Sequence, residues 1–226
     1  MSDALRDTAV IVPARNEAAA IGGVVRSVRR LGPAQVIVVD DASTDATAVE
    51  AQGAGAEVVP ARGRGYGRAC HAGVAAVRGS PIVAFIDGDG SFDPEDLATL
   101  TKLVRDGADL ALGTRARTRA MPLHQRLGND LTLALLRLLY GVRLDDIAPL
   151  RAIRADALER LEMRPTRYAW LVEMLAKAAR RRLRIACLTV RYGPRVGGVS
   201  KVSGSPRGSV LAGLDFLGAL LAYRRW

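Results

Sequence analysis

The feature that most constrains the fold is a regular alternation between apolar runs and helical spacing in the first half of the chain. The first run is followed by Ile21, Val24, Val25 and Val28, which have the i, i+3, i+4, i+7 spacing of an amphipathic helix. The apolar runs lie at 8–12, 35–40, 57–59, 81–87 and 108–113. Parallel strands need crossover helices and are buried on both faces. We therefore predict an α/β fold with a mostly parallel sheet and helices on both faces.

Longer helical segments follow the fifth predicted strand. We predict helices at about 123–140, 152–161, 168–181 and 208–222, and a strand at about 185–191. The helix after the second strand is expected to be capped by Ser43 or Thr44. We predict one α/β domain over residues 1–207 and a C-terminal helical segment over 208–226.

Charge and cysteine content narrow the classes of partner. The 226-residue chain has 33 Lys and Arg residues against 23 Asp and Glu, a net charge of +10, which favours an anionic partner. Aromatic residues make up only 4%, so the stacking platforms of single-strand nucleic-acid binders are scarce. The two cysteines, Cys70 and Cys187, lack the spacing of a disulfide framework or a zinc site. Because no signal-peptide pattern opens the chain, we predict a cytoplasmic protein.

Polar loops follow four of the predicted strands, at the edge where open parallel sheets bind ligands. These loops are PARNE at 13–17, DDASTD at 40–45, RGRGYGR at 62–68 and DGDGSFDP at 87–94. Asp93, near the end of the last loop, and Glu95 and Asp96, just after it, are typical of the start of a helix. Asp87 and Asp89 remain, and their hard oxygen ligands suit Mg²⁺ or Mn²⁺ better than zinc.

Two other loops point to nucleotide or phosphate binding. Asp40 has the place of the acid that holds a ribose in dinucleotide-binding folds, but the first loop lacks their G-x-G pattern and no P-loop sequence occurs. Arg62, Arg64 and Arg68 alternate with glycines, as in a loop that binds phosphate through backbone N–H and guanidinium groups. A flexible, solvated loop fits the same residues.

Seven segments, taken in order, resemble one known family. They are VIVPARNE, VIVVDDASTDAT, RGYGRACHAG, AFIDGDGSFDP, RLGND, DDIAPLRAI and RVGGVSKVSG. The chain resembles inverting family 2 glycosyltransferases of the GT-A fold, and most of all the branch that transfers mannose or glucose to dolichyl or polyprenyl phosphate. The resemblance covers nearly the whole chain, from Val10 to Gly204.

The resemblance implies a role for each residue that matches a family motif. The nucleotide sugar would be bound by Pro13, Asn16, Glu17, Asp40, Arg68 and Asp87. The divalent cation, Mg²⁺ or Mn²⁺, would be held by Asp87, Asp89 and Ser91. Donor and acceptor phosphates would be bound by Arg115, Arg126, Arg195, Ser200 and Lys201. The catalytic residues would be Asp146, Asp89 and Arg126, with Asp146 at the place of a general base.

The acceptor is the part of this interpretation that stays open. The segment LDDIAPLRAI has Pro149 and Leu150 where the family has Gly-Phe, while Arg151 is kept. Asp145 and Asp146 also fit a turn before a helix. A polyprenyl phosphate is favoured, and an acceptor hydroxyl in solution is the alternative. Two other classes are a sugar nucleotidyltransferase and a non-catalytic nucleotide-binding module.

The C-terminal stretch VLAGLDFLGALLAY at 210–223 is interrupted by Asp215 and is too short to cross a bilayer. Its flanking Arg207, Arg224 and Arg225 suit a helix that lies on an anionic membrane surface. An ordinary packed helix, or one face of a homodimer, fits the same stretch. The predicted location is therefore cytoplasmic, either free or peripherally bound to the inner face of the membrane.

Overall fold

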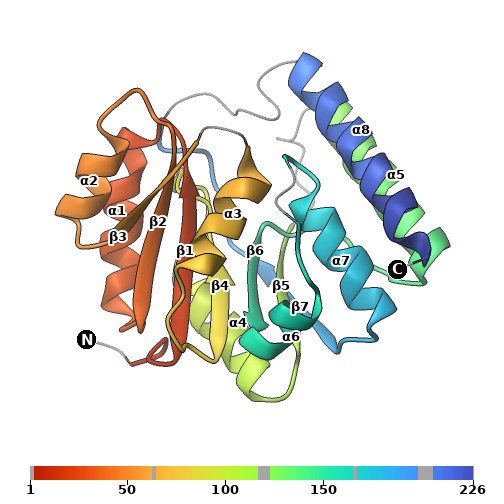
Figure 1. Ribbon diagram of the computed structural model, residues 1–226, viewed down its shortest axis with the longest axis horizontal. Coiled ribbons are helices and arrows are strands. Elements are labelled where there is room, and N and C mark those ends of the chain that lie inside the picture. Colours follow the sequence, from red (N-terminus) through yellow and green to blue (C-terminus); the bar gives the residue numbers. More distant parts are fainter. Residues whose placement is uncertain (1–2, 63–64, 117–122, 165–166, 198–205, 226) are drawn as a thin grey trace.

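The computed structural model describes residues 3–62, 65–116, 123–164, 167–197 and 206–225, without the side chains of 123–127, 206–211 and 225. Within these ranges, seven strands form one sheet in the order β3-β2-β1-β4-β6-β5-β7 (Figure 1). The strands are β1 (Thr8–Ala14), β2 (Gln35–Asp41), β3 (Glu57–Ala61), β4 (Ile82–Phe85), β5 (Leu110–Arg115), β6 (Leu150–Arg154) and β7 (Ile185–Val190). The pairings are parallel except for those that β6 makes with β4 and β5. The predicted mostly parallel sheet is confirmed.

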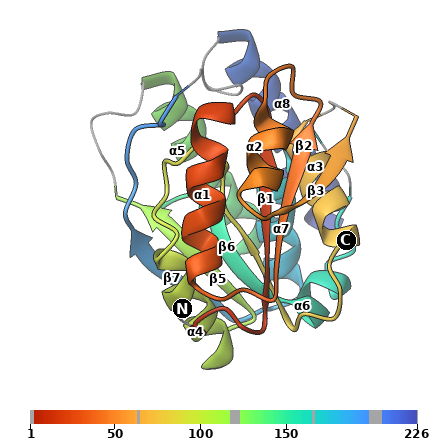
Figure 2. The same ribbon diagram turned by 90° about the vertical axis from the view of Figure 1, so that its left-hand side faces the viewer.

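Helices cover both faces of the sheet. They are α1 (Ala18–Arg30), α2 (Thr47–Gly53), α3 (Tyr66–Ala75), α4 (Asp96–Arg105), α5 (Leu123–Tyr140), α6 (Ala155–Arg160), α7 (Trp170–Arg180) and α8 (Pro206–Ala222), followed by the short 3₁₀ helix η1 (Tyr223–Arg225). One face is covered by α1, α2 and α4, and the other by α3, α6 and α7. Figure 2 views the molecule from the side of α1 and α2. The helices α5 and α8 lie side by side next to α7, at the right of Figure 1.

Burial on both faces explains why the strands are apolar without alternation. In β1, Val10 and Val12 pack on the side of α1 and α4, whereas Ile11 packs on the side of α3. All three side chains are fully buried. A central strand of a doubly covered sheet therefore has no solvent-facing position for a polar residue.

One predicted helix is wrong at its start. The sequence predicts a helix over 152–161, but the structure has β6 up to Arg154 and a helix only from Ala155. The segment LRAIR contains good helix formers, yet Arg151 pairs with Phe85 of β4 on one side and with Leu112 of β5 on the other. Pairing with two neighbouring strands outweighs the local helix propensity.

The predicted cap of α2 is also wrong. The helix begins at Thr47, whose N–H donates to Asp45 Oδ1 at 3.0 Å. Ser43 and Thr44 instead bind Asn16, in the loop after β1. Two loops that meet in space use these side chains, and the sequence shows no sign of that meeting.

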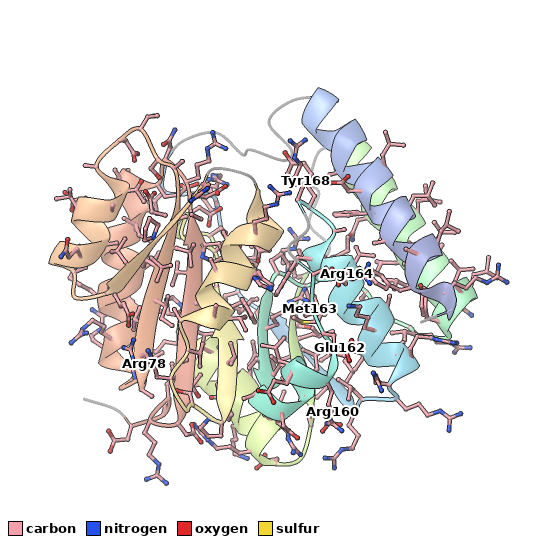
Figure 3. All side chains as sticks on the ribbon, in the orientation of Figure 1. Arg78, Arg160, Glu162, Met163, Arg164 and Tyr168 are labelled. Carbon is pink, nitrogen blue, oxygen red and sulfur yellow. The ribbon has the colours of Figure 1, made fainter. Side chains whose placement is uncertain are left out.

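A buried polar network fastens the C-terminal end of the described chain to α7. The fully buried Glu173 and Lys177 form an ion pair at 2.8 Å, and Glu173 Oε1 accepts the N–H of Arg164 at 2.9 Å. Lys177 Nζ donates to the Glu162 carbonyl at 2.7 Å and lies 4.6 Å from the ring centroid of Tyr223. Figure 3 shows Glu162 and Arg164 beside α7. These contacts hold η1, and with it the end of α8, against the domain.

The strand order places the switch point of the sheet at the carboxyl ends of β1 and β4. From β1 the chain proceeds outward through β2 and β3, while β4 lies on the other side of β1. The register of β1 with β4 ends at Ile11 and Phe85, whereas its register with β2 continues to Ala14. Ligands of open α/β sheets bind at such a point. Among the described helices, none is long and apolar enough to cross a membrane.

Candidate active site

The loop after β4 carries Asp87 and Asp89 at this switch point, and its glycines allow it to fit there. A Cβ on Gly88 would lie 3.2 Å from a side chain at the end of β1, so the loop packs directly on that strand. Gly90 has a φ of 75°, in the left-handed region, and a Cβ there would lie 2.6 Å from Cγ2 of Val196. The two glycines therefore let the carboxylates sit between the end of β1 and the segment after β7.

Asp89 is buried, and both of its carboxylate oxygens have partners. Its Oδ1 accepts hydrogen bonds from the N–H and the hydroxyl of Ser91, at 2.9 and 2.6 Å. Its Oδ2 lies 2.9 Å from Nη1 of Arg195. Ser91, predicted as a metal ligand, turns its hydroxyl toward Asp89 and orients that carboxylate.

The environment of Asp87 disfavours its ionised form, in contrast to that of Asp89. Burial, and then the charge of Asp89, raise the pKa of Asp87 to about 7, although Arg115, Arg195 and Arg151 act against the rise. Burial thus disfavours the ionised form of Asp87, and a cation bound beside it would favour that form.

A divalent cation would have this effect, and the donor set fits one. Carboxylate oxygens on a glycine-containing loop suit Mg²⁺ or Mn²⁺. In the part of the chain that the structure describes, no group of three or more His, Cys, Asp or Glu side chains could hold a metal ion. Other ligands would therefore come from a diphosphate and water, which is the usual arrangement for Mg²⁺ with phosphorylated substrates.

The loops after β1 and β2 are joined around Asn16. This residue has a left-handed φ of 53°. Its Oδ1 accepts the N–H of Thr44 at 2.8 Å, and its own N–H donates to Ser43 Oγ at 2.9 Å. The N–H of Glu17 donates to Thr47 Oγ1 at 2.8 Å. Asn16 is predicted to bind the nucleotide, and in the structure its amide oxygen accepts a hydrogen bond that holds the loops after β1 and β2 together.

The other residues predicted to bind the nucleotide lie at the same edge. Pro13 is buried in β1, and Asp40 Oδ1 accepts a backbone N–H of its own loop at 3.3 Å. Arg68 is exposed on the first turn of α3. Sequence reasoning missed Asp41, which is buried and accepts the N–H of Gly65 at 3.1 Å, at the start of α3. The two consecutive acids of DDASTD could have indicated it, because neighbouring residues of a strand face opposite sides of the sheet and Asp41 therefore has surroundings different from those of Asp40.

Asp146 is only 2% exposed and is bound to Arg115. Its Oδ2 accepts the N–H and the Nε–H of Arg115 at 3.1 and 2.9 Å, and its Oδ1 accepts from Nη2 at 2.7 Å. Burial opposes the charge of Arg115, but hydrogen bonds and attraction to Asp146 outweigh it and raise the pKa of Arg115. Three of the roughly four acceptor positions of this carboxylate are thus occupied.

Two further residues support Arg115 and Asp146. The guanidinium of Arg115 lies 5.2 Å from the ring centroid of Tyr192, a contact that nothing in the sequence indicates. Arg151 is fully buried and donates to the carbonyls of Ile147 at 2.8 Å and Ala148 at 3.0 Å. It therefore holds the turn that carries Asp146.

Residues 9–162, more than half of the chain, match the model of glycosyl transferase family 2. The chain belongs to this family. An uncharacterized glycosyltransferase of Mycobacterium tuberculosis is 42% identical over 211 residues, which cover 92% of this chain and 94% of the relative. Polyprenol monophosphomannose synthase of Mycolicibacterium smegmatis is 30% identical, over 88% of this chain and 82% of the relative.

A solved structure is similar over nearly the whole of this glycosyltransferase. Glucosyl-3-phosphoglycerate synthase from Mycobacterium tuberculosis, in complex with Mn²⁺, UDP-glucose and phosphoglyceric acid, matches with a TM-score of 0.79 and 25% identity. The match covers 98% of this chain and 81% of that one. The same enzyme is also known with Mg²⁺ and UDP. The predicted family and GT-A fold are confirmed.

Several of the residues predicted for the site lie together in the structure, and others lie outside its described part. The structure gathers Asp87, Asp89 and Arg195 at one point, and Arg115 lies near enough to influence the charge of Asp87. Arg126 lies on α5, but its side chain is outside the described part of the chain. Ser200 and Lys201 also lie outside the described residues.

Proposed function

We propose that this glycosyltransferase moves a sugar, with inversion, from a nucleoside diphosphate sugar to a polyprenyl phosphate, with Mg²⁺ or Mn²⁺ bound. The observation that carries the proposal is the carboxylate pair of Asp87 and Asp89 on the loop after β4, at the β1/β4 switch point of the sheet. A metal-bound diphosphate would satisfy this pair. Family membership argues against the two other classes, a sugar nucleotidyltransferase and a non-catalytic module.

The residues of the chain would divide the work of donor binding. The loops joined through Asn16 would provide a rigid wall for the nucleoside, and Asp40 would accept hydrogen bonds from it. Asp87 and Asp89 would hold the divalent cation, which neutralises charge on the departing diphosphate when it is bound. The acceptor oxygen bonds to the anomeric carbon from the opposite face while the bond to the diphosphate breaks.

The state of Asp146 supports an acceptor that needs no deprotonation. A general base needs an oxygen free to receive the acceptor proton, whereas Asp146 already accepts three hydrogen bonds from Arg115. A phosphate monoester oxygen is anionic near neutral pH and needs orientation more than a base. The 30% identity with a polyprenol monophosphomannose synthase supports the same acceptor class.

A hydroxyl acceptor in solution is the second candidate. It is favoured by the likeness to a synthase whose complex holds phosphoglyceric acid. In that case Asp146 would have to release part of its contact with Arg115 before it could act as the predicted base.

Titration calorimetry and a transfer assay test the proposal. GDP and UDP would be titrated into the full chain with Mn²⁺ and with EDTA, for wild type and Asp89→Asn. We expect one nucleotide to bind only with metal, and the variant to lose that binding. Sugar transfer to polyprenyl phosphate and to phosphoglyceric acid then separates the two acceptors. A folded enzyme that binds neither nucleotide with Mn²⁺ would refute the donor assignment.

The outer surface of α5 and α8 supports binding at a membrane surface. Leu214, Leu217 and Leu221 are exposed at i, i+3, i+7 spacing, opposite the buried face of α8, and Leu214 is 61% exposed. On α5, Leu138 is 78% exposed. The exposed arginines nearby include Arg137, Arg143 and Arg224. Leucines between arginines suit an anionic lipid surface, whereas a second copy of this face would bring like charges together.

Vesicle sedimentation tests this surface. Wild type should sediment with phosphatidylglycerol vesicles and much less with phosphatidylcholine, and a triple Leu214→Ser, Leu217→Ser, Leu221→Ser variant should remain in the supernatant. Val49→Ser is the matched control, because Val49 is 71% exposed on α2, far from α8 (Figure 1). Equal sedimentation of wild type and triple variant would contradict membrane binding by this face. So would a wild-type dimer that becomes monomeric in the triple variant.

A further inference from the structure

Arg195 connects the two acidic loops of the site. Its Nη1 lies 2.9 Å from Oδ2 of Asp89, and its Nη2 donates to Oε1 of Glu17, in the loop after β1. Both carboxylates are buried, and the Arg195 side chain is 25% exposed. The arginine therefore balances the charge of two nearly inaccessible carboxylates.

This contact covers the oxygen of Asp89 that a metal ion would need. Oδ1 already accepts two hydrogen bonds from Ser91, so Oδ2 is the oxygen left for a cation. A Mg²⁺ ion bound there would lie about 2.1 Å from Oδ2 and within about 5 Å of Nη1 of Arg195. Like charges at that separation repel in a buried site. The metal ion and Arg195 must therefore compete for Asp89.

A diphosphate offers Arg195 a better set of partners. The Nε of Arg195 is buried and has no hydrogen-bond partner among the described residues, which leaves a buried donor unsatisfied. A phosphate group binds guanidinium through two parallel N–H groups, so it would also satisfy Nε. The backbone need not move for this exchange. The segment is fixed to the metal loop by Val196 N–H to the Asp89 carbonyl at 3.0 Å, and by Gly193 N–H to the Ser91 carbonyl at 2.8 Å.

We propose that Arg195 is an exchangeable counter-ion, which occupies Asp89 in the donor-free enzyme and transfers to the donor diphosphate when metal and nucleotide bind together. This inference rests on the proposed function. Its consequence is that Arg195 makes metal and nucleotide binding mutually dependent. Metal alone binds weakly because it must expel Arg195, and the diphosphate removes that obstacle by accepting the arginine.

The Arg195→Gln variant tests the exchange through binding, without any activity measurement. Mn²⁺ alone, followed by electron paramagnetic resonance of the free ion, should bind about tenfold more tightly to the variant than to wild type. The nucleoside diphosphate that wild type prefers should bind the Mn²⁺ form of the variant at least about tenfold more weakly. A purely structural arginine would give the opposite sign for Mn²⁺, because its loss would disorder Asp89 and weaken both ligands.

Two further variants keep the test decisive. Arg191→Gln is the matched control, because Arg191 is exposed on the same segment and pairs with Asp93 at 2.9 Å instead of Asp89; it should change neither affinity. Arg195→Lys keeps the positive charge, so its affinity for Mn²⁺ in the absence of nucleotide should stay as weak as that of wild type. Arg195→Ala takes the place of Arg195→Gln if the glutamine variant does not fold.

The outcomes separate this inference from the function on which it rests. If wild type binds no nucleoside diphosphate with Mn²⁺, the proposed function fails and the exchange fails with it. If wild type shows metal-dependent binding but Arg195→Gln, or Arg195→Ala in its place, binds Mn²⁺ alone no more tightly than wild type, the exchange alone is refuted.

Discussion

Replacing Asp87 by asparagine should make the metal-free enzyme more stable at pH 8, although it should abolish metal-dependent nucleotide binding. The pKa of Asp87 rises from an ordinary 3.8 to about 7, first through burial and then through the charge of Asp89. Each pKa unit corresponds to about 1.4 kcal/mol, so the ionised carboxylate costs the native state up to about 4 kcal/mol at pH 8. Because the side chain keeps some exposure and can relax, we expect a measured gain of about 1–3 kcal/mol.

The sign follows from proton binding. Between pH 3.8 and about 7 the native enzyme holds a proton on Asp87 that the unfolded chain has lost. The stability of the metal-free wild type should therefore fall as pH rises through this window and level off above it. Asparagine has no proton to lose, so the gain from Asp87→Asn should be largest at pH 8 and should shrink as the pH is lowered toward 5.

Urea unfolding in EDTA at several pH values measures this gain. Asp89→Asn is the matched comparison and should have the opposite effect, because the Asp89 carboxylate already binds Arg195 and Ser91. With Mn²⁺ and nucleotide present, only wild type should gain stability. The reasoning is refuted if Asp87→Asn is less stable than wild type in EDTA at pH 8, or if its effect does not depend on pH.

Three other variants should have the following effects. Gly90→Ala should weaken Mn²⁺-dependent nucleotide binding, since φ is 75° and the new Cβ would lie 2.6 Å from Val196; adding Val196→Ala should restore part of the affinity in calorimetry. Glu173→Gln should lower the free energy of unfolding by about 3–5 kcal/mol in urea titrations, because it leaves the buried Lys177 without its counter-ion. Asp146→Asn should raise the KM for polyprenyl phosphate about tenfold with little change in kcat; a kcat loss of about 100-fold or more would instead identify Asp146 as a base.

Much of the candidate site follows from where strands end in the sequence. Asp40 and Asp87 end predicted strands and Asp89 comes two residues later, and parallel strands bring such ends to one edge. The residues that act on them from later in the chain were predicted only through family resemblance. Arg195 lies about one hundred residues from Asp89 in sequence, and no spacing rule relates the two positions.

The roles of individual polar residues were less predictable than their places. Ser43 and Thr44 fit a helix cap, Ser91 fits a metal ligand and Asp146 fits a base. In the structure the Ser43 hydroxyl accepts from Asn16 and the Thr44 hydroxyl donates to Asn16, the Ser91 hydroxyl donates to Asp89, and Asp146 accepts from Arg115. A short polar side chain bonds to the nearest suitable partner, and that partner is set by how the loops meet.

The sequence by itself determined the layered α/β architecture, because apolar runs and helical spacing record which faces are buried. It also determined the acidic edge, because strand ends are local signals. Only the tertiary structure decided that LRAIR is a strand, since its partners Phe85 and Leu112 come from distant segments. For the same reason it alone decided which carboxylate is paired: Asp87 and Asp89 look alike in DGDG, but of these two it is Asp89 that forms the ion pair with Arg195 from the segment after β7.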